Sequence, residues 1–367
     1  MKTAFIFTQP LGRNYGGILQ NYALQTVLSE FNFKPVNIEF RKKSIRRIVF
    51  EKFFLNVVTI GISCHLAYTL FKRFLTRTLY SKLDLFLRRR LHYICIEKDE
   101  SEILDRIKRT KDPVIIVGSD QVWRPKFSPF LPFYFCSFLD KKASYKHIAY
   151  AASFGVDFWE LSQEETNMAR KHIAGFDAVS VREKSAVDLC KTFLDYDKAT
   201  WVPDPTLLLK PDDYLKLFRH CPHPDHCIVT YFLRPTEEKE TMLDAVLKEV
   251  RLKRVDLSPK IQQYPLRSPE EWLACIKHAA YIVTDSFHGT VFSLLFHKQF
   301  VVLHNEYGGD TRLKEILELF HICERLFQEN DSSDILEMLK KQIDYDDIDN
   351  KLDSIRKIGY DFLKKNL

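Results

Sequence analysis

The chain has 367 residues, of which 46% are hydrophobic and 28% are charged. This composition is typical of a globular protein, and the length exceeds one ordinary hydrophobic core, so we expect two domains. The formal net charge of +6 is uneven, because residues 41–93 contain 13 Lys and Arg against two acidic residues. The rest of the chain is therefore slightly acidic, which excludes a uniformly basic nucleic-acid-binding protein.

The start of the chain predicts a cytoplasmic protein rather than an exported one. Ala4–Phe7 offers only four apolar residues before Gln9, far fewer than a signal peptide contains. The eight cysteines are scattered and form no C-x-x-C pair, which indicates reduced thiols. We interpret Lys2–Thr8 as a first β-strand.

A glycine-bearing loop, residues 12–17, follows this strand and leads into a helical pattern over Ile18–Phe31. Pro35–Phe40 predicts a second strand. Strand, loop and helix form half of a Rossmann unit, but GRNYGG lacks the G-x-G-x-x-G spacing of dinucleotide sites. The loop therefore predicts a close approach of backbone to a ligand without identifying that ligand.

Residues 41–93 interrupt the alternation of strands and helices. The basic run RKKSIRR, residues 41–47, leads into Phe53–Phe71, nineteen residues without a formal charge. A transmembrane helix fits that length, but polar residues dilute the run, and a single crossing would separate the first strand from its sheet. Two interpretations stay open: a segment lying in the interface of an anionic membrane, or a helical insertion packed on the protein.

Four later strands end in polar or glycine residues. These ends are SDQ after residue 118, SFG after residue 152, RE after residue 181 and DP after residue 203. Polar residues gathered at the carboxyl ends of apolar strands form a site on one edge of a sheet, although each alone is also ordinary turn chemistry. Their repetition predicts a functional site at this edge.

Pro211–Pro224 is interpreted as the boundary between the two domains. The run RHCPHPDHC at its end is dense in potential zinc ligands, namely His220, Cys221, His223, His226 and Cys227. Their spacing matches neither C-x-x-C nor H-x-x-x-H, and two prolines stiffen the run. We therefore favour a linker with incidental histidines over a metal site.

The stretch Tyr281–His297, YIVTDSFHGTVFSLLFH, is the centre of a second α/β unit. A short apolar strand is followed by Thr284, Asp285 and Ser286 as candidate helix caps, and then by a helical pattern. This arrangement predicts that His288 lies at the carboxyl end of a strand and at the positive end of a helix. There a histidine can meet an anion and move a proton near neutral pH; the alternative is a half-buried histidine that caps a turn.

Six motifs in order resemble the polysaccharide pyruvyl transferase family. They are NYGGILQNYALQ, VGSDQVW, YAASFG, VSVRE, DPTLLL and TDSFHGTVFS, and they span residues 12–305 without the basic insertion. The resemblance implies an α/β fold with two Rossmann-like domains facing a cleft, as in GT-B enzymes. We expect an N-terminal domain over residues 1–210, with 41–93 as a basic amphipathic insertion. A C-terminal domain over 211–345 follows, and then a helix over 346–367 that packs back on the N-terminal domain.

The resemblance also implies an enzyme, a ketal pyruvyl transferase of surface-polysaccharide (exopolysaccharide or capsule) biosynthesis. Phosphoenolpyruvate would be the donor, two hydroxyls of a hexose the acceptor, and phosphate the second product. Known members need no metal or nucleotide, so we expect no cofactor. The expected acceptor is a glycan or lipid-linked oligosaccharide at the inner face of the cell membrane, reached through residues 41–93, and no nucleic acid is expected.

By motif, the resemblance places His288 and Arg182 in the active site. Several members carry Arg two residues before this histidine, where the present chain has Ser286, so Arg234 is our candidate for the missing cation. Asp120 and Asp204 are candidates for the base that takes the hydroxyl proton. The predicted catalytic residues are His288, Arg182 and Asp120. The predicted donor-binding residues are Arg234, Ser286, Gly289, Ser153 and Gly155, and the acceptor-binding residues are Asn14, Tyr15, Gly16, Gly17, Gln121 and Asp204.

Two other functions are weighed against this one. A GT-B glycosyltransferase using a nucleotide sugar is disfavoured because no acidic residue is clearly placed for a ribose diol. A non-catalytic partner protein of the same fold predicts that site residues are lost, yet His288 and Arg182 are both present.

Overall fold

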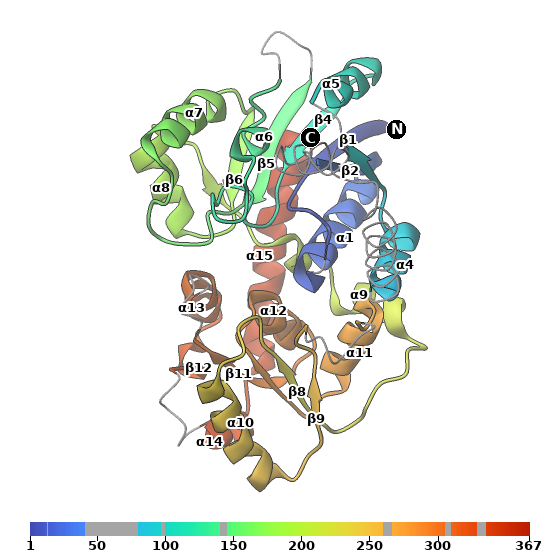
Figure 1. The fold of residues 1–367 in the computed structure, drawn as a ribbon, viewed down its shortest axis with the longest axis vertical. Coiled ribbons are helices and arrows are strands. Elements are labelled where there is room, and N and C mark those ends of the chain that lie inside the picture. Colours follow the sequence, from blue (N-terminus) through green and yellow to red (C-terminus); the bar gives the residue numbers. More distant parts are fainter. Residues whose placement is uncertain are drawn as a thin grey trace, which may run out of the picture.

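The computed structural model describes residues 1–12, 14–40, 80–96, 100–139, 145–259, 266–304, 310–328 and 335–367. Two parallel sheets flanked by helices lie one above the other along the long axis of the molecule (Figure 1). The α/β architecture with two Rossmann-like domains matches the expectation from the sequence. None of the helices within these ranges combines the length and the apolar character that a membrane span requires.

The N-terminal domain carries, among the described residues, a seven-stranded parallel sheet in the order β3-β2-β1-β4-β5-β6-β7. Its elements are β1 (Lys2–Phe7), α1 (Tyr15–Glu30), β2 (Phe33–Phe40), α4 (Ser81–Arg90), β3 (Tyr93–Ile96), α5 (Glu100–Arg109), β4 (Val114–Val117), α6 (Leu131–Tyr134), β5 (Lys146–Ala152), α7 (Gln163–Ile173), β6 (Ala178–Val181), α8 (Ser185–Leu194), β7 (Thr200–Trp201) and the 3₁₀ helix η1 (Pro205–Leu207). Strand β4 reads Val-Ile-Ile-Val and is buried on both faces, as parallel strands covered by helices are.

The C-terminal domain carries a five-stranded parallel sheet in the order β12-β11-β10-β8-β9, again counted over the described residues. Its elements are α9 (Pro211–Phe218), β8 (Ile228–Tyr231), α10 (Glu237–Val250), β9 (Arg254–Asp256), α11 (Pro269–His278), β10 (Tyr281–Thr284), α12 (Phe287–Leu295), β11 (Gln299–Leu303), α13 (Asp310–Leu319), η3 (Cys323–Arg325), β12 (Leu326–Phe327), α14 (Ile335–Lys340) and α15 (Tyr345–Asn366). Helix α12 begins where Ser286 caps it, with its hydroxyl accepting from the backbone N–H of Gly289 at 3.3 Å.

Each sheet reverses its strand order once, between β1 and β4 in the first sheet and between β8 and β10 in the second. Crevices for ligands form at the carboxyl ends of strands at such switch points. Asp120 follows β4, and His288 follows β10. The topology therefore brings one predicted site residue to the switch point of each domain.

The two domains share apolar packing as well as a polar site. Tyr15 of α1 is 2% exposed, stacks on Trp272 of α11 with ring centroids 5.5 Å apart, and donates its hydroxyl to the Arg267 carbonyl at 2.8 Å. Helix α15 runs from the C-terminal domain up along the N-terminal domain (Figure 1), where Tyr360 donates to Glu30 at 2.8 Å. The relative placement of the domains thus rests partly on buried aromatic rings.

The basic segment predicted over 41–93 lies mostly outside the described residues. Its last part is helix α4, which buries Leu83, Phe86 and Leu87 and exposes three arginines at its end, residues 88–90. Tyr93 already belongs to the sheet, because it pairs with Asn37. The segment Pro211–Phe218, interpreted from sequence as the start of a linker, is helix α9 with a buried apolar face.

Candidate active site

Arg182 is the most buried cation of the predicted site, and three carboxylates surround it. Its guanidinium donates to Asp204 at 2.9 Å and to Glu183 at 3.3 Å, and it lies 3.6 Å from Asp120. Ser153 accepts from Arg182 at 3.1 Å and donates to Glu183 at 2.5 Å. These residues follow β4, β5, β6 and β7, so the four strand ends singled out in the sequence do meet at one edge of the sheet.

Asp204 connects this cluster to His288 of the other domain. One carboxylate oxygen of Asp204 accepts from the Thr206 backbone and hydroxyl, and the other lies 3.7 Å from His288 Nε2. Burial alone would raise the pKa of Asp204, but His288, Arg182 and Thr206 outweigh it and hold this pKa well below its usual range. Asp204 is therefore an ionised carboxylate and a weak base, suited to hold His288 rather than to accept a hydroxyl proton.

His288 lies where the first turns of two helices meet, α12 from its own domain and α1 from the other. Its ring is 6% exposed, and a Cβ added to Gly16 would overlap Nδ1. Only a glycine at residue 16 allows this contact. Both helix ends present backbone N–H groups and positive dipole ends to the same place, which favours an anion there.

Nε2 of His288 has no hydrogen-bond partner within the described part of the chain, although the atom is buried. At 3.7 Å the Asp204 oxygen is too far for a hydrogen bond and close enough for an ion pair. Buried polar atoms are normally satisfied, so this nitrogen is available to a further hydrogen-bond partner.

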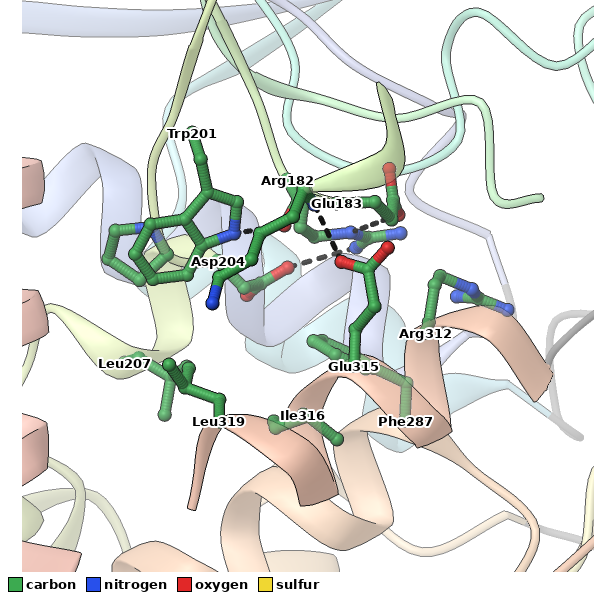
Figure 2. Close-up of a pocket in the computed structure, with 12 residues that line it drawn as sticks. Arg182, Glu183, Trp201, Asp204, Leu207, Phe287, Arg312, Glu315, Ile316 and Leu319 are labelled. Carbon is green, nitrogen blue, oxygen red and sulfur yellow. Dashed lines mark hydrogen bonds and ion pairs between the residues drawn. The ribbon is translucent and has the colours of Figure 1, made fainter. Parts of the chain in front are cut away.

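A cavity opens beside this cluster, between the ends of β6 and β7 and helices α12 and α13 (Figure 2). It is lined by Arg182, Glu183, Lys184, Trp201, Pro203, Asp204, Leu207, Phe287, Arg312, Glu315, Ile316 and Leu319. His288 is not part of this lining, whereas Asp204, which lies 3.7 Å from His288 Nε2, is. His288 therefore lies next to a residue of the lining but outside the lining itself.

Helix α13 contributes two polar residues that sequence reasoning missed, Arg312 and Glu315. Figure 2 shows both on one helix at the cavity, with Glu315 pointing toward the Arg182 and Glu183 cluster and Arg312 standing to one side of it. Arg312 lies in the first turn of a helix that follows β11, so it belongs to the same carboxyl edge of the C-terminal sheet as His288. An arginine at that position after a predicted strand was the signal available in the sequence.

Several predicted donor-binding residues use their polar groups within the protein. Ser286 caps α12, and a Cβ on Gly289 would overlap the Thr284 hydroxyl, so both shape the strand-to-helix turn. Gly155 has φ +75°, and a Cβ there would overlap the amide of Gln121. The exposed side chain of Arg234 does not line the cavity, while its backbone N–H donates to Asp285 at 3.0 Å. The structure thus does not bring Arg234 to this cavity.

The predicted acceptor residues divide into two groups. Asn14 is exposed. Its side chain and that of Asp120 both lie near Gly17: a Cβ placed on Gly17 would be 3.3 Å from the Asn14 amide and 3.5 Å from the Asp120 carboxylate. Tyr15 packs in the aromatic contact between the domains, and the Gln121 amide oxygen accepts from Arg124 at 3.1 Å. Tyr15 and Gln121 therefore make contacts within the protein, and we assign them a structural role at the site.

Asp120 is the strained residue of the site. Its φ is +74°. Two hydrogen bonds hold this backbone conformation, because the Asp120 carbonyl accepts from the N–H groups of Val122 at 2.7 Å and Ser153 at 3.1 Å. Non-glycine residues at positive φ concentrate at functional positions, where the surrounding structure offsets the strain. Asp120 faces Gly17 on one side and Arg182 on the other.

Three potential metal ligands, His223, Asp225 and His278, lie close together near the linker. Of these, only His223 was among the potential ligands named from the sequence. The Nδ1 atoms of His223 and His278 lie 3.1 and 3.3 Å from one oxygen of Asp225. The two imidazoles are stacked, with centroids 3.4 Å apart and planes 11° apart. A nitrogen lone pair lies in its ring plane, so parallel rings do not direct both nitrogens at one ion. We interpret the group as a histidine stack beside a carboxylate.

A model of one protein family, described as polysaccharide pyruvyl transferase, matches residues 14–307. The chain belongs to this family. As a member of this family it is a pyruvyl transferase, in agreement with the resemblance of the six motifs. No curated protein matches the chain in sequence.

Solved structures similar to this family member show its fold. The UDP-GlcNAc 2-epimerase of Neisseria meningitidis, bound to UDP-GlcNAc, is 11% identical over 100% of each chain, with a TM-score of 0.52. The UDP-GlcNAc 2-epimerase of Methanocaldococcus jannaschii is 11% identical over 94% of this chain and 93% of that chain, with a TM-score of 0.51. At this identity the likeness extends to the two-domain architecture alone.

Proposed function

We propose that this protein transfers the enolpyruvyl group of phosphoenolpyruvate to two hydroxyls of a hexose in a surface-polysaccharide precursor. The products are a pyruvate ketal and inorganic phosphate. The observation that carries this proposal is the unpartnered Nε2 of His288 beside the ionised Asp204, at the junction of two helix N-termini. An imidazole with an open nitrogen, next to a surface that attracts anions, suits protonation of an anionic enol phosphate.

In the proposed reaction, His288 donates a proton to the methylene carbon of the donor, which becomes a methyl group. The adjacent carbon gains oxocarbenium character, and the first sugar hydroxyl attacks it while its proton passes to a base. Asp120 is our candidate for that base, since the neighbours of Asp204 lower its pKa and make it a poor proton acceptor. Phosphate then leaves as the second hydroxyl closes the ketal, and the second hydroxyl proton departs with the phosphate.

Asp204 and Arg182 assist the proton donation indirectly, through their effect on His288. The Asp204 carboxylate stabilises a protonated imidazole, and Arg182 holds Asp204 through a bond of 2.9 Å. Because His288 is 6% exposed, the donor reaches it only if the first turns of α1 and α12 move apart. We infer that the site opens between the domains to admit substrate and closes for the transfer.

We further propose that the acceptor is lipid-linked and that residues 41–93 dock the enzyme on the inner face of an anionic membrane. The support is the charge pattern of the sequence, 13 basic residues around an uncharged apolar run. Most of this segment lies outside the described residues, so the proposal rests on sequence.

Phosphate release from phosphoenolpyruvate tests the proposed function most directly. The purified protein is given phosphoenolpyruvate and a mixed glycan-lipid acceptor, and parallel reactions contain nucleotide sugars instead. We expect acceptor-dependent phosphate release with phosphoenolpyruvate only, and the same rate after dialysis against EDTA. Transfer from a nucleotide sugar would establish the glycosyltransferase alternative, and no turnover of any donor would favour the non-catalytic one.

A further inference from the structure

The proposed donor carries a phosphate and a carboxylate, and the charge of Arg182 is already compensated. Three carboxylates lie within 3.6 Å of its guanidinium: Asp204 at 2.9 Å, Glu183 at 3.3 Å and Asp120 at 3.6 Å. A cation surrounded in this way attracts a further anion weakly, because its field is cancelled at close range. The site therefore needs a second cation.

Arg312, unlike Arg182, has a guanidinium whose charge no ion pair compensates within the described residues. It has no hydrogen bond or ion pair with any residue that the structure describes, and its buried Nε is unsatisfied. Its guanidinium lies 5.9 Å from the Phe287 ring centroid, while that of Arg182 lies 5.0 Å from the same centroid. The Phe287 ring thus lies near both guanidinium groups at the cavity.

The surroundings of Arg312 disfavour its charge only in part, because burial and Arg182 lower its pKa while the carboxylates of Glu183 and Asp120 raise it. Burial, followed by the nearby charge of Arg182, lowers the pKa of Arg312 to about 10. The other cation of the lining, Lys184, is exposed and lies 5.8 Å from the Trp201 ring centroid. Buried charges are normally paired, so an unpaired arginine beside a cavity indicates that its partner comes from outside the chain.

Helix α13 is held against the N-terminal domain by Glu315, one turn after Arg312. Glu315 accepts from the backbone N–H groups of Lys184 at 2.6 Å and Ser185 at 3.1 Å, and from the Ser185 hydroxyl at 2.6 Å. It therefore caps α8, whose own N-cap residue supplies no side-chain hydrogen bond. This contact holds the helix that carries Arg312 against the domain that carries Arg182.

We propose that Arg312 binds an oxyanion of the donor, its phosphate or carboxylate, and supplies the second cation that Ser286 does not. This inference rests on the proposed function for the identity of the donor, and on the unpaired guanidinium for the anion site itself. It replaces Arg234 in that role. The guanidinium fork would form two parallel N–H···O bonds to the bound oxyanion.

The kinetic test compares Arg312→Gln and Arg312→Lys with Lys314→Gln, which removes an exposed charge from the same helix. A charge-assisted hydrogen bond contributes enough that Arg312→Gln should raise the KM for phosphoenolpyruvate about 10- to 100-fold, with a smaller change in kcat. Arg312→Lys should recover part of the loss, because lysine supplies the charge without the fork. Lys314→Gln should behave as wild type. An effect of Arg234→Gln that exceeds the effect of Arg312→Gln would overturn the assignment.

A binding test that needs no turnover separates this inference from the proposed function. Inorganic phosphate should raise the thermal midpoint of the wild-type protein and of Lys314→Gln, and should leave that of Arg312→Gln unchanged. Without phosphate, Arg312→Gln should be at least as stable as wild type, since it removes an unpaired charge. No response of the wild type, or an equal response of Arg312→Gln, would overturn the anion site. A phosphate response without turnover of phosphoenolpyruvate would support the site and reject the donor.

Discussion

Asp204 is the residue through which the two domains share one site. It contacts Arg182 of its own domain and His288 of the other, while Thr206 holds its remaining oxygen. A carboxylate that is kept ionised beside an imidazole favours the protonated imidazole. At the scale of single residues, Asp204 is therefore the carboxylate that we propose to stabilise His288 as the acid of the transfer.

We predict that His288→Gln lowers transfer by about 10²- to 10⁴-fold, because loss of a general acid typically has an effect of this size. Glutamine retains a polar amide of similar reach, so the fold should persist. Phosphate release and circular dichroism would be measured on the same preparation. A variant that kept more than about a tenth of wild-type release would make His288 a structural residue.

Arg182 should behave differently from Arg312, because it supports Asp204 and three carboxylates depend on it. We expect Arg182→Lys and Arg182→Ala both to lower kcat strongly, since a point charge cannot replace the guanidinium fork. Removing one partner of a buried ion pair typically costs about 3–5 kcal/mol, so Arg182→Ala should also unfold at lower urea concentration. Wild-type kcat in Arg182→Lys would contradict this role.

At the scale of elements, helix α13 matters because it carries a cavity residue and a contact to the opposite domain. We predict that Glu315→Ala raises the KM for phosphoenolpyruvate, though less than Arg312→Gln does, since it loosens the helix that positions Arg312. Glu318→Ala removes an exposed carboxylate from the same helix and serves as the control. Equal donor KM values for Glu315→Ala and Glu318→Ala would show that the capping contact has no part in donor binding.

Strand β5 contains a histidine that should govern part of the stability at acid pH. His147 is buried against Phe176, with ring centroids 3.7 Å apart. Burial lowers its pKa from 6.5 to about 3, against a smaller opposing effect of a hydrogen bond with Gly175. Between these two values the unfolded chain binds a proton that the folded chain does not, so stability falls as the pH drops through this window.

We therefore predict that His147→Gln reduces the loss of stability on acidification. Each pH unit within the window corresponds to about 1.4 kcal/mol, so the wild type should lose about 2 kcal/mol more than the variant between pH 6.5 and 5. Urea unfolding at several pH values measures the slopes, which are independent of any constant packing loss. His92→Gln, at an exposed position, is the control. Parallel slopes for wild type and His147→Gln would rule out this contribution.

At the scale of the whole molecule, the basic segment and the two-domain enzyme should act together at a membrane. Each Lys or Arg near an anionic surface contributes about 1 kcal/mol, so a few suffice for reversible docking. We predict co-sedimentation with anionic liposomes and much less with neutral ones, with partial release at high salt. Reversing the charge of residues 41–43, 46 and 47 should abolish most binding and lower turnover of a lipid-linked acceptor only.

The control for membrane docking reverses Lys364 and Lys365, two exposed basic residues at the end of α15. This variant should bind liposomes as wild type does, because the charges lie outside the basic segment. Equal partitioning onto neutral and anionic liposomes, or none onto either, would leave residues 41–93 as an insertion without a membrane role.

The sequence alone determined the alternation of strands and helices, because apolar periodicity and cap residues act over a few neighbours. It also placed Asp120, Arg182, Asp204 and His288 at strand ends, since parallel strands carry such residues to one edge. Only the tertiary structure decided which of them meet. Tyr15 forms an aromatic contact between the domains, Arg234 does not line the cavity, and Arg312 and Arg182 both lie beside the Phe287 ring. These outcomes depend on how the two domains pack, and close contacts across an interface leave no local pattern in either segment of the chain.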